Sequence, residues 1–423
     1  MNVETAASAT SKPPIQSKFV KKGSYGCVMR PALPNRDNAG NWHEYPGNIT
    51  KLYTDALNAD KAVSDSGKIQ SLMGENAGLK VHTYKHRYQV KNLPENIKHS
   101  CGIIGSPYNY VSGVRQANLG IDVQDIIKPE NGAIRRQIRE LPVSKFIEQV
   151  QKVFHQVQNL VKKNYIHGDI RESNFMVNPV TGDLTIIDFD WLYPVDYFFS
   201  TYPVGSFYSN PPETLLFRNY ERFPASTSTR DNEFIKKLEL NTPSKINTYI
   251  SPYIILFPTI NIDFIVKKLQ DAKRYLALKG INTKSKFKQY LERQFDIWGL
   301  AYALTLLLKN VWPEVYSNTP APTPSSDVPY AIYEIKKVLS KILTFDIDKR
   351  IQIDEAVSEI DKIAEMDRRM YAAVAASNAM SAASISALAP HLNSINSAVG
   401  GRIRQIRKKL NRRKRTRKSH MRN

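Results

Sequence analysis

The chain has 423 residues, of which 42% are hydrophobic and 23% charged, which is typical of a globular protein with about two to four domains or one large two-lobed domain. Its net charge of +21 is uneven: residues 401–423 hold twelve lysines and arginines and no acid, so the first 400 residues carry only +9. Two cysteines, Cys27 and Cys101, are too few for a disulfide scaffold or a cysteine-rich zinc site and favour a reducing compartment.

No signal peptide is predicted, because the first residues lack a basic stretch followed by an apolar core. The longest strongly apolar run, Trp298–Leu308, is too short to cross a bilayer. These patterns predict an intracellular protein without a membrane-spanning segment.

The first third of the chain is predicted to be rich in β-strands. Residues 1–17 form a disordered lead-in rich in Ala, Ser, Thr and Pro. Short apolar runs and glycines over 19–53 are typical of β-hairpins, with 31–47 as a long loop between two strands. A helix is compatible with 56–73, and 79–123 return to short strand-like runs.

Helical periodicity dominates the rest of the chain. Apolar residues at i, i+3, i+4 and i+7 predict an amphipathic helix over 144–163, and two short strands follow at 175–177 and 184–187. Further helices are predicted at 262–279, 295–308, 329–343 and 353–368. The sequence therefore predicts an α+β fold with a β-rich N-terminal part and a larger helical part.

The residues most suggestive of chemistry follow the amphipathic helix. They are His167-Gly-Asp-Ile-Arg-Glu-Ser-Asn174 and, after the second strand, Ile186-Ile-Asp-Phe-Asp190. Two carboxylates and a carboxamide on tight turns suit phosphoryl transfer: Asp169 would receive the proton of the acceptor hydroxyl, and Asn174 and Asp188 would hold Mg²⁺. Positioning and electrostatics then supply most of the catalysis.

These two motifs resemble the H-R-D-L-x-x-x-N and D-F-G motifs of the protein-kinase superfamily, with the same spacing. The resemblance covers about residues 19–368. It implies a two-lobed, kinase-like fold, ATP and Mg²⁺ as cofactors, and transfer of the γ-phosphoryl group to Ser or Thr hydroxyls of protein substrates. It also implies that Arg171, two residues after Asp169, assists at the γ-phosphate.

The N-terminal part resembles the ATP-binding elements of kinases. The residues implied to bind the cofactor are Gly23, Ser24, Tyr25, Gly26, Val28, Lys51, Ala117, Asn118, Leu119 and Asp122. The first five resemble the end of the Gly-rich loop over the phosphates, and Lys51 would orient the α- and β-phosphates. Asp65 or Glu75 would pair with Lys51. Asp122 lies near the ribose in this interpretation, or caps a helix.

Three later segments continue the resemblance. Asn210-Pro-Pro-Glu213 resembles the A-P-E motif, Phe295-Asp-Ile-Trp-Gly-Leu300 the D-x-W-x-x-G start of a helix, and Asp346-Ile-Asp-Lys-Arg350 the D-P-x-x-R segment. The resemblance implies a structural ion pair between Glu213 and Arg350. The long interval 214–295 contains an insertion, which would dock a substrate or cover the lobe.

Two departures from the kinase motifs bear on regulation and function. Gly168 replaces the arginine that meets a phosphorylated loop, so activation by loop phosphorylation is not expected. Asp190 replaces the last glycine of D-F-G, which makes a flip of that turn harder. The H-G-D and D-F-D sequences also occur in kinase-like enzymes that phosphorylate small molecules, so an enzyme of that class is one alternative to a protein kinase. A nucleotide-binding scaffold is another alternative.

The predicted domains are a lead-in, two kinase lobes, a linker and a tail, at 1–17, 18–117, 118–368, 369–400 and 401–423. The dense positive charge of the tail favours non-specific nucleic acid as its partner, with nuclear import or an anionic membrane surface as alternatives. The whole pattern is similar to divergent kinases of large nucleocytoplasmic DNA viruses, which implies the cytoplasm or nucleus of a host cell, or a virion.

Overall fold

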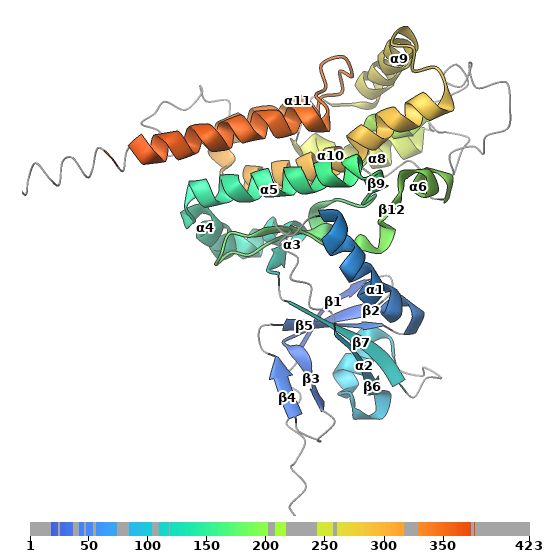
Figure 1. The fold of residues 1–423 in the computed structure, drawn as a ribbon, viewed down its shortest axis with the longest axis vertical. Coiled ribbons are helices and arrows are strands. Elements are labelled where there is room, and N and C mark those ends of the chain that lie inside the picture. The colour runs from blue at the N-terminus through green and yellow to red at the C-terminus, as the bar shows by residue number, and fades with distance from the viewer. Residues whose placement is uncertain are drawn as a thin grey trace, which may run out of the picture. The chain divides into compact units, whose positions relative to one another are not determined.

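The computed structural model describes residues 18–23, 26–36, 42–45, 48–53, 56–73, 84–103, 110–117, 119–201, 208–216, 243–256, 260–316, 329–373 and 376 (Figure 1). The chain divides into two compact units, 1–364 and 365–423. In the second unit the described residues are helical up to 373, and Arg368 and Arg369 both bind Glu365.

The first unit is a mixed α+β structure, as predicted. Its N-terminal part contains a five-stranded antiparallel sheet in the order β1-β2-β5-β7-β6 (Figure 1). These strands are β1 Lys18–Gly23, β2 Gly26–Arg30, β5 Asn48–Tyr53, β6 Tyr84–Gln89 and β7 Tyr110–Ala117. Lys51 lies on the central strand β5, opposite Val28 of β2 and Val114 of β7.

The segment 31–47 is more ordered than its prediction as a long loop. Two short antiparallel strands, β3 Ala32–Arg36 and β4 Trp42–Tyr45, form a hairpin within it. The residues of β4 include two aromatic side chains, which favour a strand. The prediction of a loop was therefore wrong for these two stretches.

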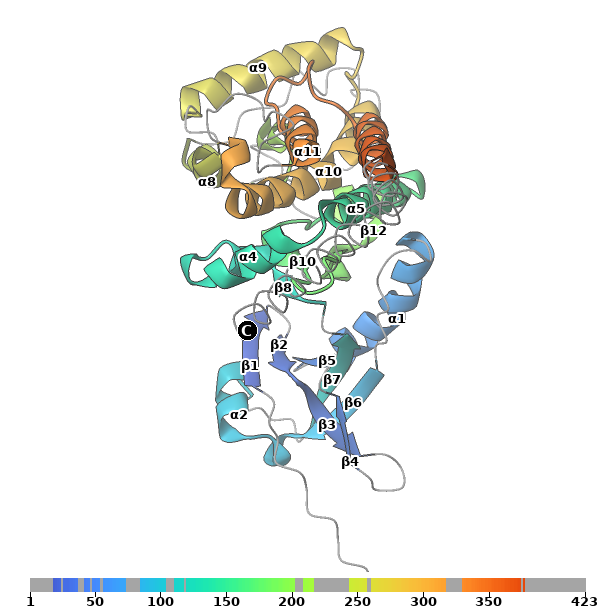
Figure 2. The same ribbon diagram turned by 90° about the vertical axis from the view of Figure 1, so that its left-hand side faces the viewer.

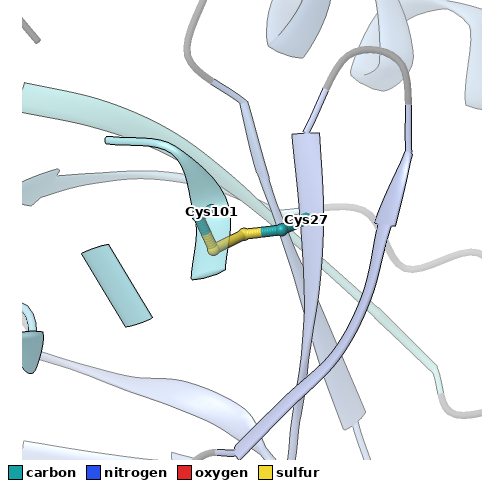
Figure 3. Close-up of a disulfide and its surroundings, with 2 residues drawn as sticks. All are labelled: Cys27 and Cys101. Carbon is teal, nitrogen blue, oxygen red and sulfur yellow. A yellow bond between two sulfur atoms is a disulfide. The ribbon is translucent and has the colours of Figure 1, made fainter. Parts of the chain in front are cut away.

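The two cysteines form a disulfide, against the expectation drawn from their number. Cys27 of β2 and Cys101 of the short helix α2 Glu95–Cys101 have their Cα atoms 5.5 Å apart, and both are buried (Figure 3). A count of two excludes a scaffold of several bridges, but a single bridge depends only on where the fold places the two residues. Here α2 packs on β1 and β2 through a small core that contains both sulfurs.

Loss of this bridge is expected to lower the free energy of unfolding of the N-terminal part by about 2–4 kcal/mol, because it closes a loop with a sequence separation of 74. The measurement is urea unfolding with and without dithiothreitol, on the native chain and on the Cys27→Ala/Cys101→Ala variant. The native midpoint should fall with reductant while that of the variant stays constant. An unchanged native midpoint would contradict a bridge that contributes to stability.

Helix α1, Ala56–Met73, has the bounds predicted for it and connects the sheet to the helical part. It contacts β7 on one side and α5, Val143–Lys162, on the other (Figure 2). Its residues Ile69, Leu72 and Met73 belong to the same core cluster as the helices that follow. The amphipathic helix predicted over 144–163 is confirmed by α5.

The helical part surrounds one long buried helix. Helix α10, Lys284–Val311, contacts α5 and α11, Tyr330–Ile342. Every residue from 294 to 308 is buried, so its apolar run belongs to the protein core. The helix begins at Lys284 and not near residue 295. Across the described ranges, no helix has the length and apolar character needed to span a membrane.

Other helices complete this part. Those with predicted counterparts are α9 Ile262–Leu278 and a helical stretch that begins at residue 353. The short helices α3 Val123–Ile126, α4 Gly132–Glu140 and α6 Val195–Thr201, together with the longer α8 Pro243–Leu256, were not predicted.

Small sheets carry the loops of the candidate site. Strands β8 Ile121–Asp122, β10 Phe175–Val177 and β11 Leu184–Ile186 form one antiparallel sheet. Strands β9 Tyr165–Ile166 and β12 Tyr193–Pro194 form another. The predicted strands at 175–177 and 184–187 are thus confirmed.

The predicted ion pair between Glu213 and Arg350 is confirmed. Arg350 Nη1 lies 2.7 Å from Glu213 Oε2, and both side chains are fully buried. Arg350 also donates through Nε to the Thr344 carbonyl at 3.0 Å, and its guanidinium stacks over the Trp298 ring. The pair fastens the turn η5, Pro212–Leu216, to the segment that precedes the last helix.

Breaking this pair is expected to lower the free energy of unfolding by about 3–5 kcal/mol, since one charge would remain buried alone. Arg350→Met and Glu213→Leu should each show this loss in chemical denaturation. The double variant should lose less than the sum of the two, because neither charge is then left unpaired. Strict additivity would show that the two side chains are not coupled.

Candidate functional site

The loop 167–174 is shaped by a buried, neutral histidine. Burial lowers the pKa of His167 to about 4. The Asp169 backbone N–H donates to His167 Nδ1 at 3.3 Å, and His167 Nε2 lies 3.1 Å from the Ile187 carbonyl. With Nδ1 as acceptor, the proton belongs on Nε2, where it can be donated to Ile187. His167 therefore ties this loop to the strand end that carries Asp188, and its ring packs on Phe189.

Asp296 of α10 binds the start of the same loop through hydrogen bonds. Its carboxylate accepts hydrogen bonds from the backbone N–H groups of His167, at 2.6 Å, and Gly168, at 2.9 Å. Burial raises the pKa of Asp296 to about 6, and the two donors act in the opposite direction. Because Asp296 lies in the middle of the long helix α10, its hydrogen bonds anchor the loop to the protein core.

Two glycines are required here by close contacts. Gly168 has φ +77°, and a Cβ on it would lie 2.3 Å from the Phe198 ring. A Cβ on Gly299 would lie 2.1 Å from the Ile170 carbonyl oxygen. The space beside Gly168 is thus closed by Phe198 of α6, which gives a physical reason for a glycine at this position.

Asp169 is the predicted base, and its carboxylate has two neighbours. Asn174 Nδ2 donates to Asp169 Oδ2 at 2.7 Å and to its carbonyl at 2.9 Å. Arg171 Nε lies 3.3 Å from Asp169 Oδ1. Burial raises the pKa of Asp169 to about 6, although the Arg171 guanidinium lowers it. A carboxylate with such a pKa can accept a proton near neutral pH.

Asp188 follows strand β11 closely and has a strained backbone conformation. Its φ is +64° and its ψ +64°, in the left-handed region that few non-glycine residues adopt. Its Oδ1 lies 3.6 Å from Lys51 Nζ of the five-stranded sheet. The Ile187 N–H donates to the Asn174 carbonyl at 2.9 Å, so Asp188 and Asn174 lie on adjoining backbone segments. Strain of this kind often accompanies a functional constraint.

The structure brings together Lys51, Asp169, Arg171, Asn174 and Asp188 among the predicted site residues. Among the described residues, Asp188 is one partner of Lys51. The side chain of Asp65, in α1, is not described, and Glu75 lies outside the described residues. The pairing of Lys51 with either residue therefore stays a prediction.

The remaining cofactor-binding predictions concern the sheet and the connection to β8. Gly23 and Gly26 face each other at the end of the β1–β2 hairpin, next to Val28. Ser24, Tyr25 and Asn118 lie outside the described residues. Ala117 ends β7, and Leu119 is half-buried just beyond it.

Asp122 accepts a hydrogen bond from the Asp125 N–H at 2.7 Å as the N-cap of α3. This contact supports the capping alternative for Asp122, and its ribose contact stays a prediction.

The donor set fits a magnesium ion that is completed by other ligands. Asp188 Oδ1 is buried and accepts no hydrogen bond from the residues that the structure describes, and the backbone of Asn174 is hydrogen-bonded to Ile187, the residue before Asp188. In the described ranges no group of three or more His, Cys, Asp or Glu is arranged for a metal. Two protein oxygen ligands are nevertheless what Mg²⁺ takes when phosphate and water supply the others.

Sequence reasoning missed several residues that shape the site. Phe198 closes the space beside Gly168, and Tyr208 donates a short hydrogen bond to Glu172 Oε1 in the turn η3, Glu172–Asn174. Neither residue belongs to a recognisable motif. Asp296 belongs to the segment 295–300, whose pattern does not predict its hydrogen bonds to the loop.

Comparison of the sequence with models of known protein families and with curated proteins finds no match.

Proposed function

We propose that the chain is an ATP- and Mg²⁺-dependent protein kinase with a two-lobed, kinase-like fold that transfers the γ-phosphoryl group to Ser or Thr hydroxyls of proteins. The observation that carries the proposal is the convergence of Lys51, Asp169, Asn174 and Asp188 from separate segments on one place. Their types and order along the chain suit phosphoryl transfer.

Each side chain has a role that its surroundings support. Asp169, hydrogen-bonded by Asn174, accepts the proton of the acceptor hydroxyl. Lys51 supplies positive charge for the α- and β-phosphates, and Arg171 supplies it near the γ-phosphate. Asn174 and Asp188 would hold Mg²⁺, which when bound neutralises negative charge on the phosphates.

A protein acceptor is favoured over a small molecule by the segment around Glu213. The buried pair with Arg350 fixes η5 to the helical part, and Tyr208, just before η5 in the chain, contacts the loop 167–174. A small acceptor would not require an anchored segment at this place. The preceding residues 202–207 lie outside the described ranges.

The test is transfer of labelled γ-phosphate from ATP to a mixed protein pool, with Asp169→Asn beside the native chain. Label on Ser and Thr of proteins with the native chain alone is the expected result. If the native chain binds Mg-ATP but labels no protein, a small-molecule acceptor replaces the proposal. If it binds no nucleotide, the scaffold alternative replaces it.

We further propose that residues 401–423 bind nucleic acid without sequence preference. Dense lysine and arginine release counterions from a phosphate backbone, so the affinity should fall steeply with salt. Deletion of 401–423 should weaken binding to a mixed-sequence duplex at least about tenfold at low salt and spare phosphoryl transfer. A chain with the same tail residues in scrambled order is the matched control and should bind like the native one. Equal affinity of the deleted and native chains would rule out this role.

A further inference from the structure

The segment that leads into η5 is held by two tyrosines of helix α8, within the predicted insertion. The Tyr249 hydroxyl donates to the Asn210 carbonyl at 2.7 Å, and the Tyr253 hydroxyl donates to the Tyr208 carbonyl. The Tyr253 hydroxyl in turn accepts the indole N–H of Trp298 at 2.5 Å. Figure 2 shows α8 beside α10, which carries this tryptophan. The segment is thus fixed through its backbone to two buried tyrosines of α8.

Tyr208 continues this connection to the catalytic loop. Its hydroxyl donates to Glu172 Oε1, and its ring lies 5.2 Å from the Tyr302 ring between centroids. Glu172 is 7% exposed, and its second oxygen, Oε2, is buried without a hydrogen-bond partner in the described ranges. Loss of the Tyr208 hydroxyl would therefore leave a buried carboxylate with no donor there, which is unfavourable.

Glu172 is the direct neighbour of Arg171, whose guanidinium lies beside the Asp169 carboxylate. A carboxylate released by Tyr208 would compete with Asp169 for this guanidinium. We infer that the hydrogen bond from Tyr208 helps to keep Arg171 beside Asp169. Hydrogen bonds thus run from α8 through Tyr208 to Glu172, and the peptide chain joins Glu172 to Arg171, which lies beside the residue proposed as the base.

No phosphate is needed for this arrangement. Phosphorylated loops are usually ordered through arginine partners, and the position that would carry one is occupied by Gly168 and closed by Phe198. A hydroxyl from Tyr208 and two hydroxyls from α8 instead fix the segment through neutral hydrogen bonds to carbonyls and one to a carboxylate.

We propose that Tyr208, held in place by Tyr249 and Tyr253, is a positioning residue that orders the catalytic loop without phosphorylation of the preceding segment. This inference rests on the proposed function for its kinetic consequence. It also gives part of the insertion a role, because α8 holds the segment that an acceptor protein would meet. We call the hydrogen bonds from Tyr249, Tyr253 and Tyr208 the brace.

The first test compares Tyr208→Phe with Tyr302→Phe in the full chain. Both changes remove one hydroxyl from the same ring cluster, but in the part of the chain that the structure describes the Tyr302 hydroxyl makes none of the hydrogen bonds that hold this segment. With the mixed protein pool at one fixed concentration, Tyr208→Phe should lower the maximal rate about tenfold or more and leave the KM for ATP within about twofold. Tyr302→Phe should stay within about twofold in both. Equal losses of maximal rate in the two variants would show that the effect comes from packing of the rings and not from the Tyr208 hydroxyl.

A conservative pair tests the acceptor side. Glu172→Gln keeps an oxygen for the Tyr208 hydroxyl, whereas Glu172→Ala removes it, so the glutamine variant should lose clearly less rate. Treatment of the native chain with a phosphatase should leave its rate within about twofold. A large loss after dephosphorylation would overturn the inference.

A readout independent of activity separates this inference from the proposed function. Hydrogen exchange of peptides covering 167–174 and 208–216 should speed up in Tyr208→Phe and not in Tyr302→Phe, with both variants melting within a few degrees of the native chain. If the native chain labels no acceptor but this difference is found, the proposed function fails and the brace stands. If exchange in 167–174 is the same in all three chains, the brace fails whatever the activity.

Discussion

Asp188→Asn is expected to lower phosphoryl transfer by about 10³-fold or more while the chain stays folded. The loss of one preorganised charged or polar group at a transition state already costs about 10²–10³ in rate. Here the change also removes one of the two oxygen ligands proposed for Mg²⁺ and the anion beside Lys51. Removing the charge on Asp188 therefore affects both the metal and the lysine.

The fold should tolerate this change for a specific reason. Asp188 has a left-handed backbone conformation, and asparagine is among the few residues that adopt it readily. The side chain keeps its size, and the change leaves the core unaltered. The thermal midpoint of Asp188→Asn should consequently stay within a few degrees of the native value.

The matched control is Asp183→Asn, on the turn of the same β10–β11 hairpin. Asp183 accepts a hydrogen bond from Thr181 near the surface and takes no part in the site. Its variant should keep its rate within about twofold. In the native chain Mg²⁺ should tighten ATP binding, and in Asp188→Asn this gain should largely vanish. Full turnover in a folded Asp188→Asn chain would overturn the metal assignment.

The parts of the fold that sequence predicts well are those with strong local periodicity. Helix α5 has a complete apolar stripe, and the short strands β10 and β11 flank an unmistakable turn. Because the motif residues follow these elements directly, the loop that carries Asp169 and Asn174 could be placed from sequence. Asp188 followed from the end of β11.

Several helices without a predicted counterpart nevertheless carry local signals at their ends. Helix α2 follows Pro94 and ends at Gly102, which adopts the left-handed conformation typical of a helix end. Pro243 is the first residue of α8, a position that suits proline. Pro252 inside α8 further obscured its helical character.

Other features could not be predicted from local sequence at all. The bridge between Cys27 and Cys101 depends on the packing of α2 against the sheet. The hydrogen bond from Tyr208 to Glu172 spans 36 residues and joins two side chains without a motif. The contact of Lys51 with Asp188 requires that the sheet and the helical part meet. Such contacts are set by tertiary packing, which a single sequence does not reveal.

Asp169→Asn is expected to lower the rate of transfer by about 10²–10⁴-fold, the usual contribution of a positioned general base. In the native chain the base must be ionised. Since burial raises the pKa of Asp169 to about 6, kcat/KM should rise with pH, about tenfold per unit, up to about pH 6 and then level off. This limb is the signature of the proposed base in the free enzyme.

Two other groups lose a proton in the same pH range, so the rise of kcat/KM with pH has to be assigned to one of the three groups. Asp296 also has a pKa raised to about 6, and a phosphate of the nucleotide loses its last proton near this pH. Arg171 distinguishes them, because its guanidinium lowers the pKa of Asp169 and is not among the groups that act on Asp296. In Arg171→Met the pKa of Asp169 should therefore rise and the limb move to higher pH. A limb that stays in place would assign it to Asp296 or to the nucleotide, and Asp169 would lose its role as the titrating base.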